Sequence, residues 1–432
     1  MILTRIGRVA AASLVAGALA SSRSSAQADS TWREYEGAMQ SARAASDTVT
    51  YRVQLAAIHH AIGSTPRIAA RYAALALAAL DKRAAAQWLG AVAAMGSALD
   101  TAMLARYAEL AGPAARASLL AAHARATSDV GAPELVYRLP DSNMIAEDIA
   151  FDARRSTMLV SSVRSGSIYA KHIPGSAPVV VKIQPDSGWG IFALGIDCGR
   201  GVLWATTAAF PMGAHWVAAD SGRSALLKFD LQSGALRGSY VAPDSGAHAL
   251  GDLAIDADGA VYVSDGVGTG VYVLDAGSSA LRTLVPPGLL VSPQTPALSS
   301  DGETLFVPDY AIGVASVNIR TGVVSWIAHS DSLALTGIDG MYRSGRDLIA
   351  VQNGLEPNRI VRLSLDAAER RVSRATTLVR GSKATELTHA TVSGGWLYFI
   401  RKSGWGRVAE DGAMTEAAAG EGPDVVRVRL TP

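Results

Sequence analysis

The chain has 432 residues, which is enough for two domains or for one large repeat domain with an appendage. Hydrophobic residues make up 49%, charged residues only 18%, and glycine occupies 42 positions, so a compact protein with many tight turns is favoured over a disordered one. The 39 basic residues almost balance the 38 acidic ones. No overall charge would attract nucleic acid or an anionic membrane surface, and nucleic-acid binding is therefore disfavoured.

The N-terminal residues 1–28 have the layout of a secretory signal peptide. Arg5 and Arg8 supply a positive region, residues 9–20 a short apolar region, and Ala26-Gln27-Ala28 a small-residue cleavage site. The apolar region is shorter than the roughly 20 residues that span a bilayer, which disfavours an uncleaved anchor. We therefore expect an exported protein, periplasmic or extracellular, without a membrane span after signal cleavage.

Residues 29–128 are rich in alanine, poor in glycine and patterned at helical spacing. Pro66 begins a helix, residues 80–82 form a turn, and a second helix ends near Gly96, which predicts a helical hairpin. Its spacing resembles one tetratricopeptide-like unit with helices on either side, although three clean repeats are not evident. The segment is expected either to offer a groove to a protein partner or to pack as a helical cap on the next domain.

From about residue 132 the pattern changes to short strands separated by turns. One unit recurs six times: a polar or small residue, an apolar stretch, an Asp or Ser five positions on, a tight turn and a hydrophobic strand. Its first positions are Glu147, Phe192, Gly251, Gln294, Asp339 and Thr388. Their spacing suits four antiparallel strands per unit, so we predict a six-bladed β-propeller over residues 132–432. Residues 134–140 and 425–430 would complete the closing blade together.

The first positions of the six units should form a ring, because the innermost strands of a propeller all point their leading ends at one mouth of the central channel. The ring and its neighbours comprise four carboxylates, one amide, two hydroxyls and one imidazole: Glu147, Asp148, Asp252, Gln294, Thr295, Asp339, Thr388 and His389. Clustered carboxylates are unfavourable unless a cation or a proton neutralises them, and oxygen-rich sets suit Ca²⁺ or Mg²⁺. The ring therefore predicts either a divalent-cation site or polar strand ends around a water-filled channel.

The segments AEDIAFD, LGDLAIDADGAVYVSD, SPQTPALSSDGETLFV and GIDGMY resemble the senescence-marker-protein/gluconolactonase/luciferin-regenerating-enzyme family. More broadly they look like TolB-like, calcium-dependent phosphotriesterase-like and strictosidine-synthase-like propellers. The resemblance covers residues 132 to the C-terminus. Carried over by register, Glu147 and Asp339 match a Glu and an Asp-Gly pair of the family. Asp252 stands where the family has an Asn, and Gln294 lies in a Pro-Gln-Thr turn where the family has Pro-Asn-Gly.

The resemblance implies an exported hydrolase of a small lactone or ester. It implies a divalent cation, Ca²⁺ above others, that acts as a Lewis acid on the carbonyl and is held by Glu147, Gln294, Asp339 and Asp252. Asp339 would activate water, and His389 is a candidate proton shuttle. The changes at the two Asn positions favour an alternative. In it, a non-catalytic propeller binds a small ligand at the channel mouth, or a protein partner that docks on the helical segment.

Overall fold

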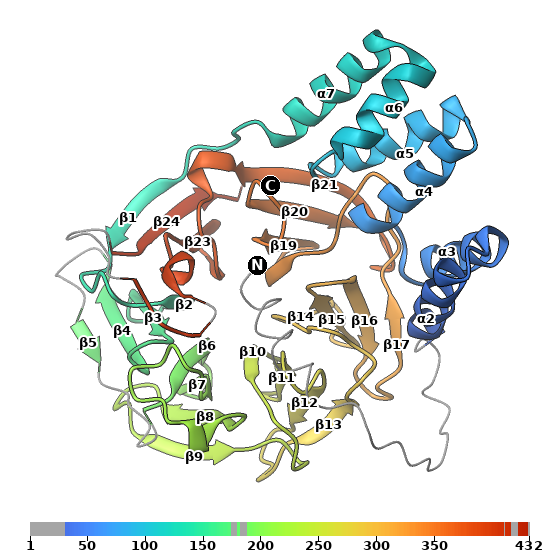
Figure 1. The fold of residues 1–432 in the computed structure, drawn as a ribbon. Helices are drawn as coiled ribbons and strands as arrows, with labels where there is room; N and C mark the ends of the chain where they lie inside the picture. The colour runs from blue at the N-terminus through green and yellow to red at the C-terminus, as the bar shows by residue number, and fades with distance from the viewer. Residues whose placement is uncertain (1–30, 174–178, 182–187, 410, 416–421, 431–432) are drawn as a thin grey trace.

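The computed structural model describes residues 31–173, 179–181, 188–409, 411–415 and 422–430. Within them, six helices precede six four-stranded antiparallel sheets arranged in a ring (Figure 1). The fold is thus the predicted six-bladed β-propeller with an N-terminal helical segment. The predicted signal peptide lies outside the described residues. Among the helices that the structure describes, none is long and apolar enough to cross a membrane.

The helical segment contains three hairpins, where the sequence indicated one with flanking helices. They are α2 (Thr31–Ala44) with α3 (Thr48–Ile62), α4 (Pro66–Ala78) with α5 (Lys82–Ala94), and α6 (Thr101–Ala111) with α7 (Pro113–Thr127). The side chains of Asp47, Asp81 and Asp100 accept backbone N–H groups at the starts of α3, α5 and α6. Successive hairpins begin about 35 residues apart, the spacing of tetratricopeptide repeats. Alanine recurs throughout these helices, so no side-chain pattern marks the individual repeats.

Each of the six sequence units forms one blade, and its first strand is the innermost, which confirms the register of the repeats. The inner strands of blades 1 to 6 are β2 (Ala146–Asp152), β6 (Gly190–Asp197), β10 (Leu250–Ile255), β14 (Ala297–Leu298), β18 (Ile338–Ser344) and β22 (Ala390–Ser393).

The remaining strands follow outward within each blade. In blades 1 to 3 they are β3 (Thr157–Ser162), β4 (Ser167–His172), β5 (Val179–Val181), β7 (Val202–Ala208), β8 (Ser224–Asp230), β9 (Leu236–Tyr240), β11 (Val261–Asp265), β12 (Val271–Leu274) and β13 (Arg282–Val285). In blades 4 and 5 they are β15 (Thr304–Asp309), β16 (Gly313–Asn318), β17 (Val324–Trp326), β19 (Asp347–Gln352), β20 (Arg359–Leu365) and β21 (Val372–Arg380).

In blades 1 to 4, the Asp or Ser at the fifth position after the start of the unit caps the turn that leaves the inner strand. In blade 1, the carboxylate of Asp152 accepts the backbone N–H groups of Arg154 and Arg155. In blade 4, the hydroxyl of Ser299 accepts the backbone N–H of Thr304. A short polar side chain that bonds the backbone just after it stabilises a tight reversal, and this local chemistry repeats with the blades.

Blade 6 joins the two ends of the propeller sequence, as predicted. Its strand order from outside to inside is β1 (Glu134–Arg138), β24 (Asp424–Arg429), β23 (Trp396–Arg401) and β22. The buried carboxylate of Asp424 accepts hydrogen bonds from Arg138 on one neighbouring strand and Arg401 on the other. The pairing of β24 with β1 closes the ring of blades.

The helical segment packs against blades 4 and 5 (Figure 1). Ile312 of blade 4 belongs to an apolar cluster with Ile58 and Ile62 of α3. The buried guanidinium of Arg359 donates to the carbonyl oxygen of Met95, just after α5, at 2.8 Å. The segment is therefore a cap on the propeller; its role as a docking surface for a partner stays a prediction.

Candidate functional site

The starts of the inner strands meet at the channel mouth and are joined by hydrogen bonds between distant blades. The ring nitrogens of His389 lie 3.0 Å from the carbonyl oxygen of Glu147 and 2.8 Å from Oδ1 of Asp252. The hydroxyl of Thr295 lies 2.8 Å from the same Asp252 oxygen and 3.0 Å from the carbonyl oxygen of Asp339. Residues from blades 1, 3, 4, 5 and 6 thus form one network, as the ring argument predicts.

His389 is the positive charge inside this network. Burial disfavours the charged imidazolium, but the carboxylates of Asp252, Asp339 and Asp148 together raise the pKa of His389 well above its usual value. Both ring nitrogens face oxygen acceptors, so the doubly protonated ring can donate to each of them. His389 therefore neutralises part of the carboxylate cluster from within the protein.

Glu147 is a buried carboxyl group with a strongly raised pKa. Burial raises the pKa of Glu147 to about 8, against the opposing effects of His389 and of the Trp405 indole N–H, which donates to Oε2. At neutral pH the Glu147 carboxyl is therefore mostly protonated. Its neighbour Asp148 is also buried, and burial raises the pKa of Asp148 to about 6, although the backbone N–H of Leu194 donates to it at 2.7 Å.

Asp339 lies deeper in the same cluster. Its Oδ2 accepts a 2.5 Å hydrogen bond from the side-chain amide of Asn353, whose own oxygen accepts from the Tyr310 hydroxyl at 3.0 Å. The other oxygen, Oδ1, is buried and has no hydrogen-bond partner among the described residues. Burial raises the pKa of Asp339, and the nearby Asp252 adds to the effect, while the imidazolium of His389 opposes it.

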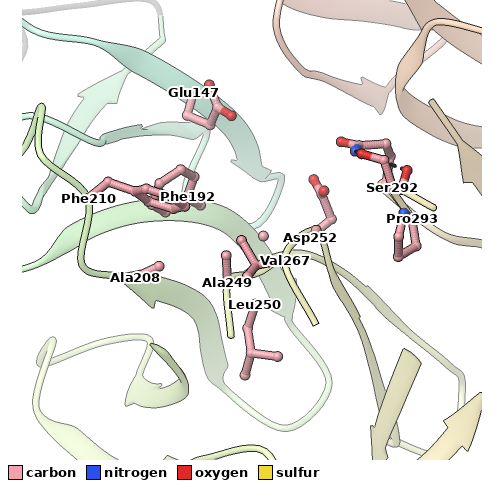
Figure 2. A pocket seen from close by; sticks show the side chains of 13 residues that line it. Glu147, Phe192, Ala208, Phe210, Ala249, Leu250, Asp252, Val267, Ser292 and Pro293 are labelled. Carbon is pink, nitrogen blue, oxygen red and sulfur yellow. Dashed lines mark hydrogen bonds between the residues drawn. The ribbon is translucent and has the colours of Figure 1, made fainter. Parts of the chain in front are cut away.

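A pocket opens beside the network, between blades 1 to 4 (Figure 2). Its polar wall contains Glu147, Asp252, Ser292 and Gln294, and its apolar wall contains Phe192, Ala208, Phe210, Ala249, Leu250, Val267 and Pro293. The cavity is small, about 40 Å³, so it has room for a few water-sized groups and not for a whole metabolite. A ligand would insert one functional group and leave the rest of its body at the mouth.

The pocket separates the predicted site residues into two sets. Glu147, Asp252 and Gln294 line it, and the amide nitrogen of Gln294 donates to the Ser292 hydroxyl at 2.9 Å. His389 and Asp339 do not line the pocket and lie behind its wall, so they can act on a ligand only through their neighbours.

The residues as arranged do not fit a bound divalent cation. Asp252 already pairs with His389, Oε2 of Glu147 accepts from the Trp405 indole, and the amide nitrogen of Gln294 donates to Ser292. Among the described residues no three Asp, Glu, His or Cys side chains converge as metal ligands. The buried unpaired oxygen of Asp339 is the one feature that would suit a cation. The predicted cation site is therefore not assembled, and Ca²⁺ binding stays a prediction.

Two residues of the site lie outside the repeated unit and were not expected. Trp405 follows β23 in the short 3-10 helix Trp405–Arg407, and Asn353 follows β19. Neither occupies a first position of a blade, so the ring argument could not select them. The only sequence signal was that tryptophans near a channel mouth can line a ligand pocket.

Comparison with known proteins gives no family for this chain. No protein-family model matches the chain, and no curated protein matches it. Among solved structures it is similar to regucalcin, a calcium-binding protein from Agrobacterium tumefaciens str. C58, with 14% identity, a TM-score of 0.47, and coverage of 68% of this chain and 93% of that one. It is also similar to a luciferin-regenerating enzyme, with 13% identity, a TM-score of 0.47, and coverage of 69% of this chain and 94% of that one. A gluconolactonase from Xanthomonas campestris has 15% identity and a TM-score of 0.44, with coverage of 63% of this chain and 93% of that one. At this level of identity, the chemistry must be argued from this chain's own residues.

Proposed function

We propose that the pocket at the channel mouth binds the ester group of a small lactone or ester and hydrolyses it with two carboxyl groups of the protein. The supporting observation is that a protonated carboxyl, Glu147, and a carboxylate paired with an imidazolium, Asp252, line the same small apolar pocket. Titratable groups whose acidity is shifted by burial and that face a cavity are typical of acid–base sites.

Glu147 would act as the acid. Its carboxyl proton would hydrogen-bond to the carbonyl oxygen of the ester and pass to that oxygen as the tetrahedral intermediate forms. The Trp405 indole N–H holds Oε2 and so fixes the orientation of the carboxyl. The aromatic rings of Phe192 and Phe210 beside it exclude water, which strengthens this hydrogen bond.

Asp252 would act as the base. Its Oδ1 is held by His389 and Thr295, and its carboxylate faces the pocket in Figure 2. It would take a proton from a water molecule whose oxygen attacks the ester carbon. When the intermediate collapses, that proton passes to the leaving alkoxide, and the hydroxyl formed from the carbonyl returns its proton to Glu147. Both carboxyl groups end the cycle as they began it, with His389 as a positioning residue.

Ester hydrolysis by the purified chain tests this proposal. We expect saturable turnover of p-nitrophenyl acetate or glucono-δ-lactone at pH 7 that persists in EDTA. Asp252→Asn should reduce the rate by about 100-fold or more, because the base is lost while the hydrogen bond to His389 can remain. Asp258→Asn, an exposed change in the same blade, is the matched control. Absence of turnover by the folded protein, or an unchanged rate in Asp252→Asn, would contradict the proposal.

Thermal unfolding with and without millimolar Ca²⁺ tests the cation prediction separately. We expect no change in Tm, because the cluster's charge is already compensated by His389 and by the proton on Glu147. A ligand that binds only the folded state raises Tm by mass action. A rise in Tm that Asp339→Asn abolishes would show that the cluster does hold a cation, and the hydrolysis should then also be sensitive to EDTA.

A further inference from the structure

A second and much larger cavity lies between the helical segment and the propeller. It has a volume of about 430 Å³ and is bounded by α2, α3 and α4 on one side and by loops of blades 4 and 5 on the other. In Figure 1 these helices stand beside the strands of blade 4. Cavities at domain interfaces with volumes of a few hundred Å³ are frequent sites for small molecules.

The walls of this interdomain cavity are mainly apolar. The helices contribute Trp32, Ile58, Ile62 and Ile68, and the propeller contributes Val291, Ile312 and Leu355. An aliphatic or aromatic body of a ligand would remove apolar surface from water on both sides. The cavity is therefore suited to a molecule with a substantial apolar part, unlike the small pocket at the channel mouth.

One end of the cavity carries a net positive charge. Arg71 donates to both carboxylate oxygens of Glu36, at 2.9 and 2.8 Å, so these two residues neutralise each other. Arg67 reaches Glu36 only at 3.4 Å and its side chain is 76% exposed, which leaves one guanidinium to spare. The N-terminus of α4, where Thr65 is the cap and Pro66 the first residue, also lines the cavity. The positive end of the helix dipole adds to the preference for an anion.

A buried hydrogen-bond donor in the wall has no partner among the residues that the structure describes. Trp32 is 8% exposed, and its indole Nε1–H makes no hydrogen bond to any of them. Buried donors are usually paired, and an unpaired one is unfavourable. A polar group of a ligand seated against this indole would supply the missing acceptor.

We propose that the interdomain cavity is a binding site for a small organic carboxylate with an apolar body. The single surplus positive charge matches a monoanion, and a doubly charged phosphate would be left partly uncompensated. The guanidinium of Arg67 receives the carboxylate near the positive end of the α4 dipole, and the isoleucine and tryptophan side chains receive the apolar body. This site is separate from the channel mouth and does not depend on the hydrolysis proposed there.

Isothermal titration of the purified chain with sodium octanoate tests this site, with octanamide as the uncharged analogue. We expect octanoate to bind at least about tenfold more tightly than octanamide, because charge-assisted hydrogen bonds are stronger than neutral ones. Arg67→Gln should weaken octanoate binding about fivefold, as suits an exposed charge. Ala311→Trp, which fills the cavity from an exposed position, should abolish it.

Arg106→Gln, an equally exposed change on α6, is the matched control and should leave octanoate binding unchanged. The proposal would be overturned if octanoate did not bind. It would also be overturned if octanoate bound equally to the wild type, Arg67→Gln and Ala311→Trp, since binding would then be elsewhere. Ester hydrolysis should be the same in all these variants, so the two proposals can fail independently.

Discussion

Replacing His389 by glutamine is expected to lower the free energy of unfolding by about 3–5 kcal/mol, the usual effect of removing one partner from a buried ion pair. The imidazolium is 2% exposed and lies 2.8 Å from Asp252, with Asp148 and Asp339 also near enough to raise its pKa. Glutamine keeps a polar side chain and removes the charge. Urea denaturation followed by circular dichroism measures the change.

A second substitution separates the effect of the lost charge on stability from the effect of altered packing. In the double variant His389→Gln with Asp252→Asn, both charges are removed, so the loss of stability should be smaller than the sum of the two single losses. His172→Gln, an exposed change on β4, should alter stability by less than about 0.5 kcal/mol. A His389→Gln variant as stable as the wild type would contradict the role of His389 as an internal counter-charge.

Glu147→Gln is expected to slow ester hydrolysis by about 100-fold or more, because glutamine retains a hydrogen-bond donor and cannot deliver a proton. The wild-type rate should fall as the pH rises past about 8, where Glu147 loses its proton. The variant should lack this alkaline limb. Initial rates between pH 6 and 10 measure both effects, and Glu303→Gln, an exposed substitution in blade 4, serves as the control. An unchanged alkaline limb in Glu147→Gln would assign the proton to another group.

The same substitution should increase stability at alkaline pH. In the unfolded chain the pKa of Glu147 is near its usual value of 4.5, whereas burial in the folded protein raises it to about 8. Between these values the folded state binds more protons than the unfolded state, so the wild type loses stability as the pH rises. Glutamine removes that loss. The gain should be near zero at pH 4 and largest at about pH 8, and no gain at pH 8 would mean that Glu147 is not held protonated.

The structural pattern of the propeller was readable from the sequence because it is built from local signals that repeat. In blades 1 to 4 the turn after the inner strand is capped by an Asp or Ser side chain at its start, as with Asp152 and Ser299. The recurring turns and strands mark six blades, and ring closure then places their first residues at one mouth. The helical repeats, in contrast, share an alanine-rich composition, and only the packing of the helices shows that there are three hairpins.

The sequence by itself determined which leading residues of the inner strands reach the channel mouth, since strand register and blade number follow from local periodicity and turn chemistry. Only the tertiary structure decided how these residues are paired. His389 meets Asp252 across 137 residues of sequence, and Trp405 meets Glu147 across 258. The protonation of each carboxyl group depends on how far the surrounding blades bury it from water and on the charges of its neighbours. Burial and long-range Coulomb interactions are properties of the closed ring, and no local stretch of sequence contains them.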